Sequence, residues 1–171
     1  KASYFILLST NNYNVFTFDN QKMICAIKEM GHEIGLHFDP SKYTNDINQH
    51  FENQILLLNK IIDNSIYSVS LHNPSMHNKY PNFSGYNNAY SKRFFNSSNY
   101  LSDARFNFRN KEPFDFIETI DDSVTQISLH PIHYSIEGEA NYMPILKKIY
   151  HKNLLEFKNE FSLNSKAAEE L

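Results

Sequence analysis

The chain has 171 residues, of which 41% are hydrophobic and 20% are charged, the composition of a globular domain rather than of a disordered segment. A net charge of −3 gives no reason to expect a nucleic-acid partner, because phosphate binding requires clustered Lys and Arg. No apolar run approaches the roughly 20 residues of a membrane-spanning helix. A single cysteine excludes an internal disulfide and fits a reducing, cytoplasmic compartment. We therefore expect one cytoplasmic domain over residues 1–171.

The beginning of the chain predicts a missing upstream segment. The first residue is Lys1, with no signal-peptide pattern after it, and the chain is already inside an apolar, strand-like run by Tyr4. A domain that begins inside an element is expected to have lost residues before it, and with them part of its site.

Short apolar runs alternate with helical patterns along the chain. The runs that predict strands are 4–8, 33–36, 66–71, 100–102 and 124–129. The segments that predict helices are 20–30, 46–63, 114–120 and 142–161. The clearest is 46–63, where apolar residues at spacings of three and four form one stripe, made of Ile47, Phe51, Ile55, Leu58 and Ile62. Asp19 can cap the first helix and Gly31 can end it. The segment 73–99 is rich in Asn, Ser and Tyr, has no sustained period and predicts a long loop.

The order of these elements indicates a parallel α/β fold. Strand, helix, strand, helix, strand is the pattern of a parallel sheet with crossover helices. The strands are expected to be apolar without alternation, as in a sheet covered on both faces. The pattern by itself leaves a closed barrel and an open sheet as alternatives.

Polar side chains follow four of the predicted strands, at the point where each strand ends. Three strands run directly into His37, His72 and His130, and the strand at 100–102 runs into Asp103. Because the carboxyl ends of parallel strands meet at one rim, we expect these groups to lie together. Imidazoles and a carboxylate on one rim can hold a divalent metal or transfer protons.

The stretch Gly31–His37, which reads Gly-His-Glu-Ile-Gly-Leu-His, resembles the second motif of the polysaccharide deacetylases, carbohydrate esterases of the NodB-homology type. Three further pieces fit in order. Residues 1–7 resemble the strand ahead of that motif, 70–75 occupy the place of the third motif, and 127–130 resemble the closing Leu-His motif. The resemblance spans roughly residues 1 to 134. It implies a distorted (β/α) barrel, incomplete at the N-terminus, that removes an N- or O-acetyl group from a sugar or polysaccharide with a metal.

The resemblance also implies roles for individual residues. His37 would be a ligand of zinc or another divalent metal, and His130 would be the general acid that protonates the leaving amine or alkoxide. Asp103 and Arg105 lie where the family often has an acidic group that orients this histidine. The family's second histidine ligand, four residues after the first, is replaced here by Ser41.

Two departures from the family pattern leave the metal site open. The family's aspartate pair, which supplies a base and a ligand, is expected upstream of Lys1. The missing histidine could be replaced by Asp39 turned inward or by His72. We favour His72, with Asp39 as a substrate-binding group. The other expected substrate-binding residues are Asn14, Arg105 and Pro74.

Several alternatives therefore stay open. A divergent deacetylase acting in envelope polysaccharide assembly is favoured, by analogy alone. A glycan-binding barrel that has lost turnover through Ser41 and another (β/α)-barrel metal amidohydrolase are the alternatives. The aromatic residues of 73–99 could stack on sugar rings, although packing onto the fold is the favoured interpretation. His133 is a candidate supporting contact to His130, with a purely structural role favoured.

Overall fold

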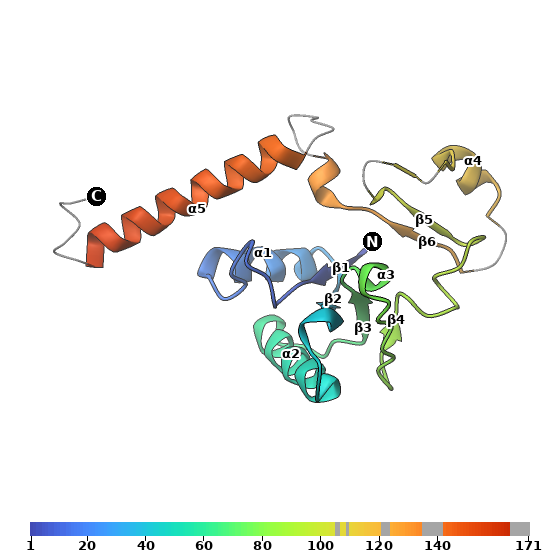
Figure 1. The fold of residues 1–171 in the computed structure, drawn as a ribbon, viewed down its shortest axis with the longest axis horizontal. Coiled ribbons are helices and arrows are strands. Elements are labelled where there is room, and N and C mark those ends of the chain that lie inside the picture. Colours follow the sequence, from blue (N-terminus) through green and yellow to red (C-terminus); the bar gives the residue numbers. More distant parts are fainter. Residues whose placement is uncertain (105–106, 109, 121–123, 135–141, 165–171) are drawn as a thin grey trace. The chain divides into compact units, whose positions relative to one another are not determined.

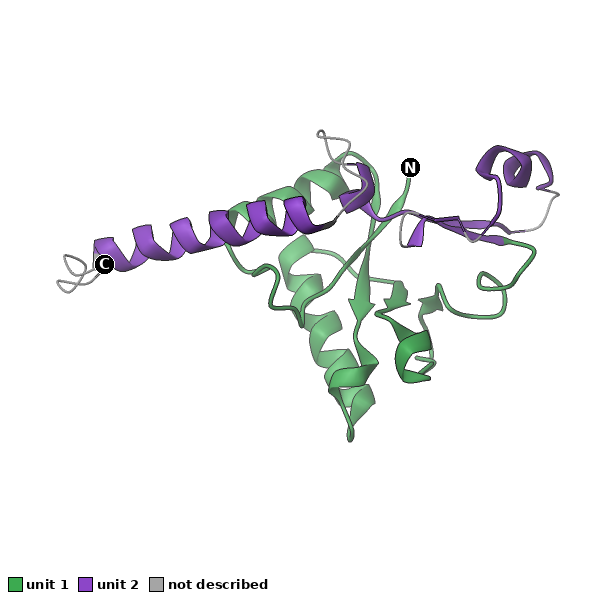
Figure 2. Ribbon diagram, turned by 45° about the horizontal axis from the view of Figure 1, so that its top comes forward, with its two compact units in different colours: residues 1–99 green, residues 100–171 purple. Residues whose placement is uncertain are grey.

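Two parallel sheets form the framework of the chain in the computed structural model, which describes residues 1–104, 107–108, 110–120, 124–134 and 142–164 (Figure 1). The chain divides into two compact units, residues 1–99 (unit 1) and residues 100–171 (unit 2) (Figure 2). Unit 1 contains a four-stranded sheet and unit 2 a two-stranded sheet, and every strand pair is parallel. The expected mixed α/β fold with parallel strands is therefore confirmed, and the expected single domain stays a prediction.

The sheet of unit 1 has the strand order β1-β2-β3-β4. Its strands are β1 (Ser3–Ile6), β2 (Glu33–Phe38), β3 (Ser68–Leu71) and β4 (Asn87–Asn88). The first three match predicted strands to within a few residues. His37 pairs in register with Ser70, and the His72 N–H donates to the Phe38 carbonyl oxygen at 2.8 Å. The carboxyl ends of β2 and β3 therefore lie side by side.

Unit 1 contains four helices in its described residues, and the ends of the first show how the sequence sets their limits. They are α1 (Phe18–Glu29), the 3-10 helix η1 (Pro40–Lys42), α2 (Ile47–Ile62) and α3 (Pro74–His77). The cap expected from Asp19 is wrong, because the Thr17 hydroxyl accepts the Asn20 N–H and Asp19 lies in the first turn. Gly31 ends α1 as expected, with a φ of 82° that favours glycine. The segment 73–99 is not a loop throughout, since it contains α3 and β4.

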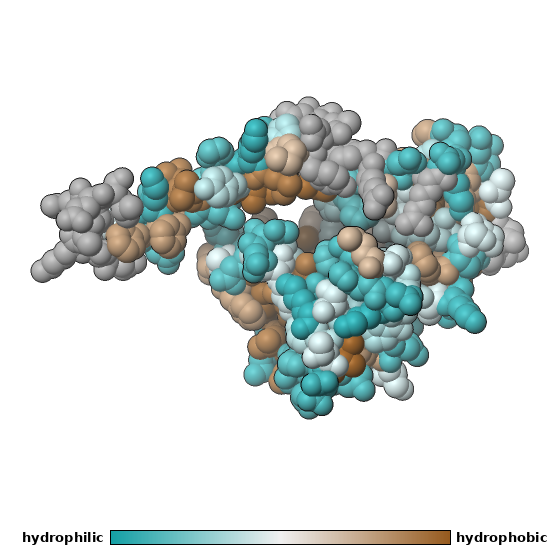
Figure 3. Space-filling view, viewed as in Figure 1, coloured by the Kyte–Doolittle hydropathy of each residue, from teal (hydrophilic) through white to brown (hydrophobic). Residues whose placement is uncertain are grey.

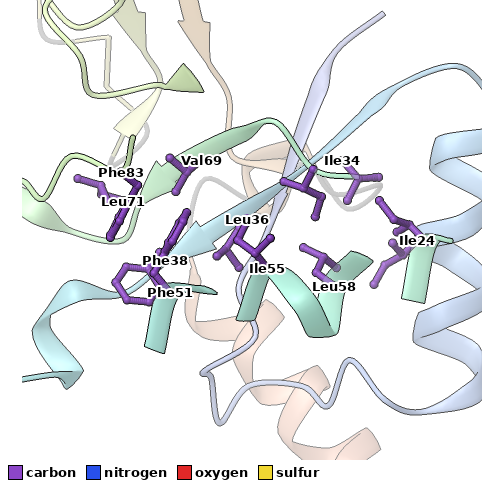
Figure 4. Close-up of a cluster of buried hydrophobic side chains, with 12 residues drawn as sticks. Ile24, Ile34, Leu36, Phe38, Phe51, Ile55, Leu58, Val69, Leu71 and Phe83 are labelled. Carbon is purple, nitrogen blue, oxygen red and sulfur yellow. The ribbon is translucent and has the colours of Figure 1, made fainter. Parts of the chain in front are cut away.

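The core of unit 1 lies between the sheet and α2. Ile34, Leu36 and Phe38 alternate along β2 onto one face, where the stripe on α2 predicted from its spacing covers them (Figure 4). Residues of α2 in this core are Phe51, Ile55, Leu58 and Ile62. β3 adds Val69 and Leu71, and the buried side chain of Phe83 reaches the same cluster.

The opposite face of the sheet is lined by small and polar residues. Gly35 and His37 lie there on β2, and Ser68 and Ser70 lie there on β3. The expectation that these strands are apolar on both faces is therefore wrong. A Cβ at Gly35 would lie 2.7 Å from ring carbons of Phe5 and 2.8 Å from the Ser68 hydroxyl oxygen, so the close packing here admits glycine. The alternation places His37 on this polar face.

Unit 2 is built from a second strand pair and three helices in its described part. These elements are β5 (Tyr100–Ser102), α4 (Pro113–Glu118), β6 (Gln126–Ser128), the 3-10 helix η3 (Pro131–Tyr134) and α5 (Tyr142–Asn164). Ser102 pairs with Ser128, which aligns the carboxyl ends of β5 and β6. The helix α5 carries exposed apolar side chains along its length (Figure 3). Among the described helices, none combines the length and the hydropathy that crossing a bilayer demands.

We predict that two adjacent leucines of α2 differ sharply in their contribution to stability. Leu58 is fully buried in the core and Leu57 is 41% exposed. Leu58→Ala leaves a cavity and should lower the free energy of unfolding by about 2–5 kcal/mol. Leu57→Ala, the matched control, should lower it by less than about 1 kcal/mol. Urea unfolding followed by circular dichroism measures both, and equal losses would contradict this packing.

Candidate functional site

In unit 1 the structure brings His37 and His72 together at the ends of β2 and β3. His37 Nε2 lies 3.2 Å from His72 Nδ1, and the two ring planes are close to perpendicular, with an angle of 87°. The Asn73 side-chain amide lies 3.0 Å from His72 Nε2, which orients this ring with Nδ1 toward His37. Two ring nitrogens at this separation can share a proton or bind one metal ion, because ligand atoms around tetrahedral zinc lie about 3.3 Å apart.

The surroundings of His72 favour its neutral form. Burial lowers the pKa of His72 most strongly, the charges of Lys42 and His77 lower it further, and Asp39 opposes them. A neutral imidazole has the lone pair that a metal needs. His72 is therefore a chemically suitable ligand at neutral pH.

Ser41 donates two hydrogen bonds to the Asp39 carboxylate. Asp39 is 5% exposed and caps η1, where its Oδ1 accepts the Ser41 N–H at 3.0 Å and the Ser41 hydroxyl at 2.6 Å. Burial would raise the pKa of Asp39, but the bonds from Ser41 and the charges of His72 and Lys42 lower it. Asp39 is thus an anion beside the histidine pair, with one oxygen already used by Ser41.

In unit 2 the structure brings Asp103 and His130 together. Asp103 follows β5 and His130 follows β6 by two residues. The carboxylate accepts the His130 backbone N–H at 2.9 Å, and its Oδ1 lies 2.6 Å from His130 Nδ1. Asp103 is 2% exposed, whereas the His130 side chain is 49% exposed. The buried carboxylate therefore holds one nitrogen of a ring that solvent can reach.

His133 is a second imidazole on the same carboxylate. Its Nδ1 lies 3.0 Å from Asp103 Oδ2, and its side chain is 3% exposed. His130 and His133 are the ends of one 3-10 turn, in which the His133 N–H donates to the His130 carbonyl oxygen at 2.9 Å. Across the described ranges, Asp103, His130 and His133 are the one group of three His, Cys, Asp or Glu residues whose ligand atoms all lie within 4.8 Å of one another. This group could bind a metal ion.

The histidines keep Asp103 ionised. Burial would raise the pKa of Asp103, but hydrogen bonds from the ring and backbone of His130, and the charges of His130 and His133, lower it below its ordinary 3.8. The same carboxylate affects Tyr134, whose pKa is raised by burial and then by the charge and hydrogen bond of Asp103. Asp103 is therefore the negative centre of this group.

The expected meeting of His37, His72, Asp103 and His130 on one rim stays a prediction, because the first two belong to unit 1 and the others to unit 2. Of the expected substrate-binding residues, Asn14 is exposed in the turn before α1 and accepts the Phe16 N–H at 3.0 Å. Pro74 is fully buried at the start of α3. Arg105 lies outside the described residues.

The aromatic residues of 73–99 fall into two groups. Phe83 is buried and stacks on Phe51, with ring centroids 3.7 Å apart, as the packing interpretation expects. Tyr80 is 45% exposed and lies 6.2 Å from Tyr90, which in turn lies 4.8 Å from Phe95. Tyr80 is the exposed member of this second group, whereas Tyr90 packs against the core.

One contact was missed by sequence reasoning, and one was identified there only as a candidate. The role of Asn73 in orienting His72 has no signal beyond its adjacency. His133 does carry one, because three-residue spacing from His130 brings the two side chains onto one side of a 3-10 turn. Pro131 between them is consistent with the start of such a turn.

Comparisons with known proteins identify no relative. No protein-family model, no curated protein and no solved structure matches the chain. The interpretation of the two histidine groups therefore depends on their geometry and on the motif resemblance.

We predict that Asp103 stabilises the fold in a pH-dependent way. Because its pKa is lower in the folded protein than its ordinary 3.8, the carboxylate contributes stability above that pH, and this contribution is lost as the pH falls through the folded-state value. Asp103→Asn should lower the free energy of unfolding by about 1–3 kcal/mol at pH 7. The difference from wild type should shrink as the pH is lowered from 4 to 2.

The measurement is urea unfolding at stepped pH, with Asp115→Asn, an exposed carboxylate of α4, as the matched control. A difference between wild type and Asp103→Asn that does not change with pH would contradict the proposed ionisation.

Proposed function

We propose that this chain is a divergent polysaccharide-deacetylase-like hydrolase, which removes an acetyl group from a sugar or polysaccharide with the help of a divalent metal. The parallel strands would belong to a distorted (β/α) barrel, and the substrate would be an acetylated carbohydrate in cytoplasmic steps of envelope polysaccharide assembly. The stretch Gly31–His37 and the order of the later motifs support this proposal.

The observation that carries the proposal is the contact between Asp103 and His130. A carboxylate on Nδ1 fixes the ring orientation and leaves Nε2 to exchange a proton with substrate. His130 Nε2–H would then protonate the nitrogen or oxygen of the sugar as its bond to the acetyl carbon breaks, so the sugar leaves as a neutral amine or alcohol.

The metal would be held by His37 and His72. Their facing nitrogens, 3.2 Å apart, match the spacing of two zinc ligands, and His72 supplies the imidazole that the family pattern lacks at Ser41. A bound divalent metal lowers the pKa of its water and polarises the acetyl carbonyl. Asp39, beside the pair, can balance the positive charge or accept a sugar hydroxyl through the oxygen that Ser41 does not use.

The exposed ring of Tyr80 supports a carbohydrate substrate. Tyr80 is 45% exposed, Tyr90 lies next to it with ring centroids 6.2 Å apart, and aromatic faces stack on the apolar faces of sugar rings. The same surface would serve the alternative function, a glycan-binding barrel without turnover.

The proposed function predicts acetate release that depends on His130. The full chain is incubated with zinc and either an N-acetylglucosamine oligosaccharide or an O-acetylated oligosaccharide, and acetate is measured. His130→Gln should lower kcat by about 100- to 10,000-fold, the range for loss of a general acid. His151→Gln, an exposed histidine of α5, is the matched control and should not change the rate.

Unchanged turnover in His130→Gln would contradict the proposed acid. Sugar binding with no acetate release from either substrate would favour the glycan-binding alternative, and hydrolysis of cyclic amides instead would favour the amidohydrolase alternative.

The shared-ligand geometry of His37 and His72 gives a further prediction. Replacing a residue that supports a metal ligand lowers metal affinity by roughly 10- to 100-fold, so His37→Gln and His72→Gln should each lower zinc affinity by at least that much. The double variant should lose far less affinity than the product of the two single losses, because both rings bind the same ion. Calorimetric zinc titration measures these affinities, with His50→Gln on α2 as control. Full additivity would show that the two rings do not share an ion.

A further inference from the structure

The group Asp103, His130 and His133 brings three metal-binding atoms together without any residue of unit 1. His130 Nδ1 lies 2.6 Å from Asp103 Oδ1, and His133 Nδ1 lies 3.0 Å from Asp103 Oδ2. Ligand atoms around tetrahedral zinc lie about 3.3 Å apart, so both nitrogen–oxygen distances are within about 1 Å of that separation. All three donor atoms lie within 4.8 Å of one another.

Two side chains of this group are buried and the third is accessible to solvent. Asp103 and the His133 side chain are almost fully buried, and the carboxylate is also tied to the His130 backbone N–H. The His130 ring is half exposed, which gives an ion from solvent a way in. Two imidazoles and one carboxylate form a ligand set known for zinc, with a fourth position left for water.

We propose that Asp103, His130 and His133 form a binding site for a divalent transition metal ion, additional to the His37–His72 pair, and that an ion bound there stops His130 from transferring protons. Nitrogen donors select zinc, cobalt or nickel over magnesium and calcium, which prefer oxygen ligands.

The blocking follows from the position of Nδ1. The proposed acid needs Asp103 on this nitrogen to orient the ring, and an ion bound at Nδ1 would take the place of that contact. This second part rests on the proposed function, whereas the binding site does not.

The test begins with the full chain carrying His37→Gln and His72→Gln, so that the unit 1 pair cannot contribute. Calorimetric titration with zinc should still show one ion per chain. Adding His133→Gln or His130→Gln should weaken that binding at least tenfold, an order-of-magnitude expectation for loss of one of three ligands. His151→Gln is the matched control and should leave the affinity unchanged. Cobalt(II) gives a second readout, because ligand-field absorption should appear with the starting variant and be lost with His130→Gln.

Folding is checked by circular dichroism, and the exposure of the His130 ring makes His130→Gln the variant least able to disturb the core. Absence of zinc and cobalt binding in the folded starting variant would overturn the site. Unchanged affinity in folded His130→Gln and His133→Gln would overturn it as well.

Inhibition tests the second part separately. In wild type, acetate release should fall as zinc is raised beyond saturation of the His37–His72 pair, and His133→Gln should move this fall to at least about tenfold higher zinc, measured relative to the activity of that variant without excess zinc. Zinc binding at unit 2 with undiminished acetate release would overturn the blocking. Absence of acetate release at any zinc concentration would count against the proposed function alone, because the titrations decide the site without activity.

Discussion

The burial of one face of β2 beneath α2 is the constraint from which the site in unit 1 follows. Ile34, Leu36 and Phe38 must all point toward the helix, because each removes a large apolar side chain from water. A strand alternates its side chains, so this requirement sends Gly35 and His37 to the opposite face. There the lack of a side chain at Gly35 admits Phe5 and Ser68, and His37 lies beside β3, within reach of His72.

A buried carboxylate has the corresponding role in unit 2. An isolated ionised aspartate loses several kcal/mol of hydration on burial, which would shift its pKa upward and neutralise it. Asp103 avoids this because two imidazoles and a backbone N–H point at its oxygens. The strand pair β5–β6 sets the register that makes these contacts possible, and the η3 turn adds His133 to the same carboxylate. The negative charge of Asp103 therefore positions both imidazole rings, and its contact with His130 Nδ1 leaves Nε2 of that ring for proton transfer.

The two groups differ in the chemistry that they favour. His37 and His72 offer two facing nitrogens, with His72 held neutral by burial, which suits metal binding. Asp103 fixes one nitrogen of an exposed ring, which suits proton transfer. A hydrolase of an acetyl group needs both functions, one to activate water and one to protonate the leaving group. The second imidazole on Asp103 is not required for proton transfer alone, and it is the basis of the metal site that we propose in unit 2.

What the sequence by itself determined was the local structure and the residue types at the strand ends. The spacing of Phe51, Ile55 and Leu58 predicted α2, and a helix stripe of this kind depends only on neighbours in the chain. His37, His72, Asp103 and His130 were identified because short apolar runs stop at them. The alternation of β3 was misjudged, because a serine among apolar residues can lie on either face until a helix covers one of them.

Only the tertiary structure decided which of these residues touch. His37 and His72 are far apart in the chain and meet because the parallel register of β2 and β3 aligns their ends. The hydrogen bond from the Ser41 hydroxyl uses one oxygen of Asp39 within its own turn. His133 reaches Asp103 because a single 3-10 turn separates it from His130. Contacts of this kind arise from strand register and turn geometry. Both are set by packing between segments that are distant in the chain, whereas sequence periodicity describes each segment separately.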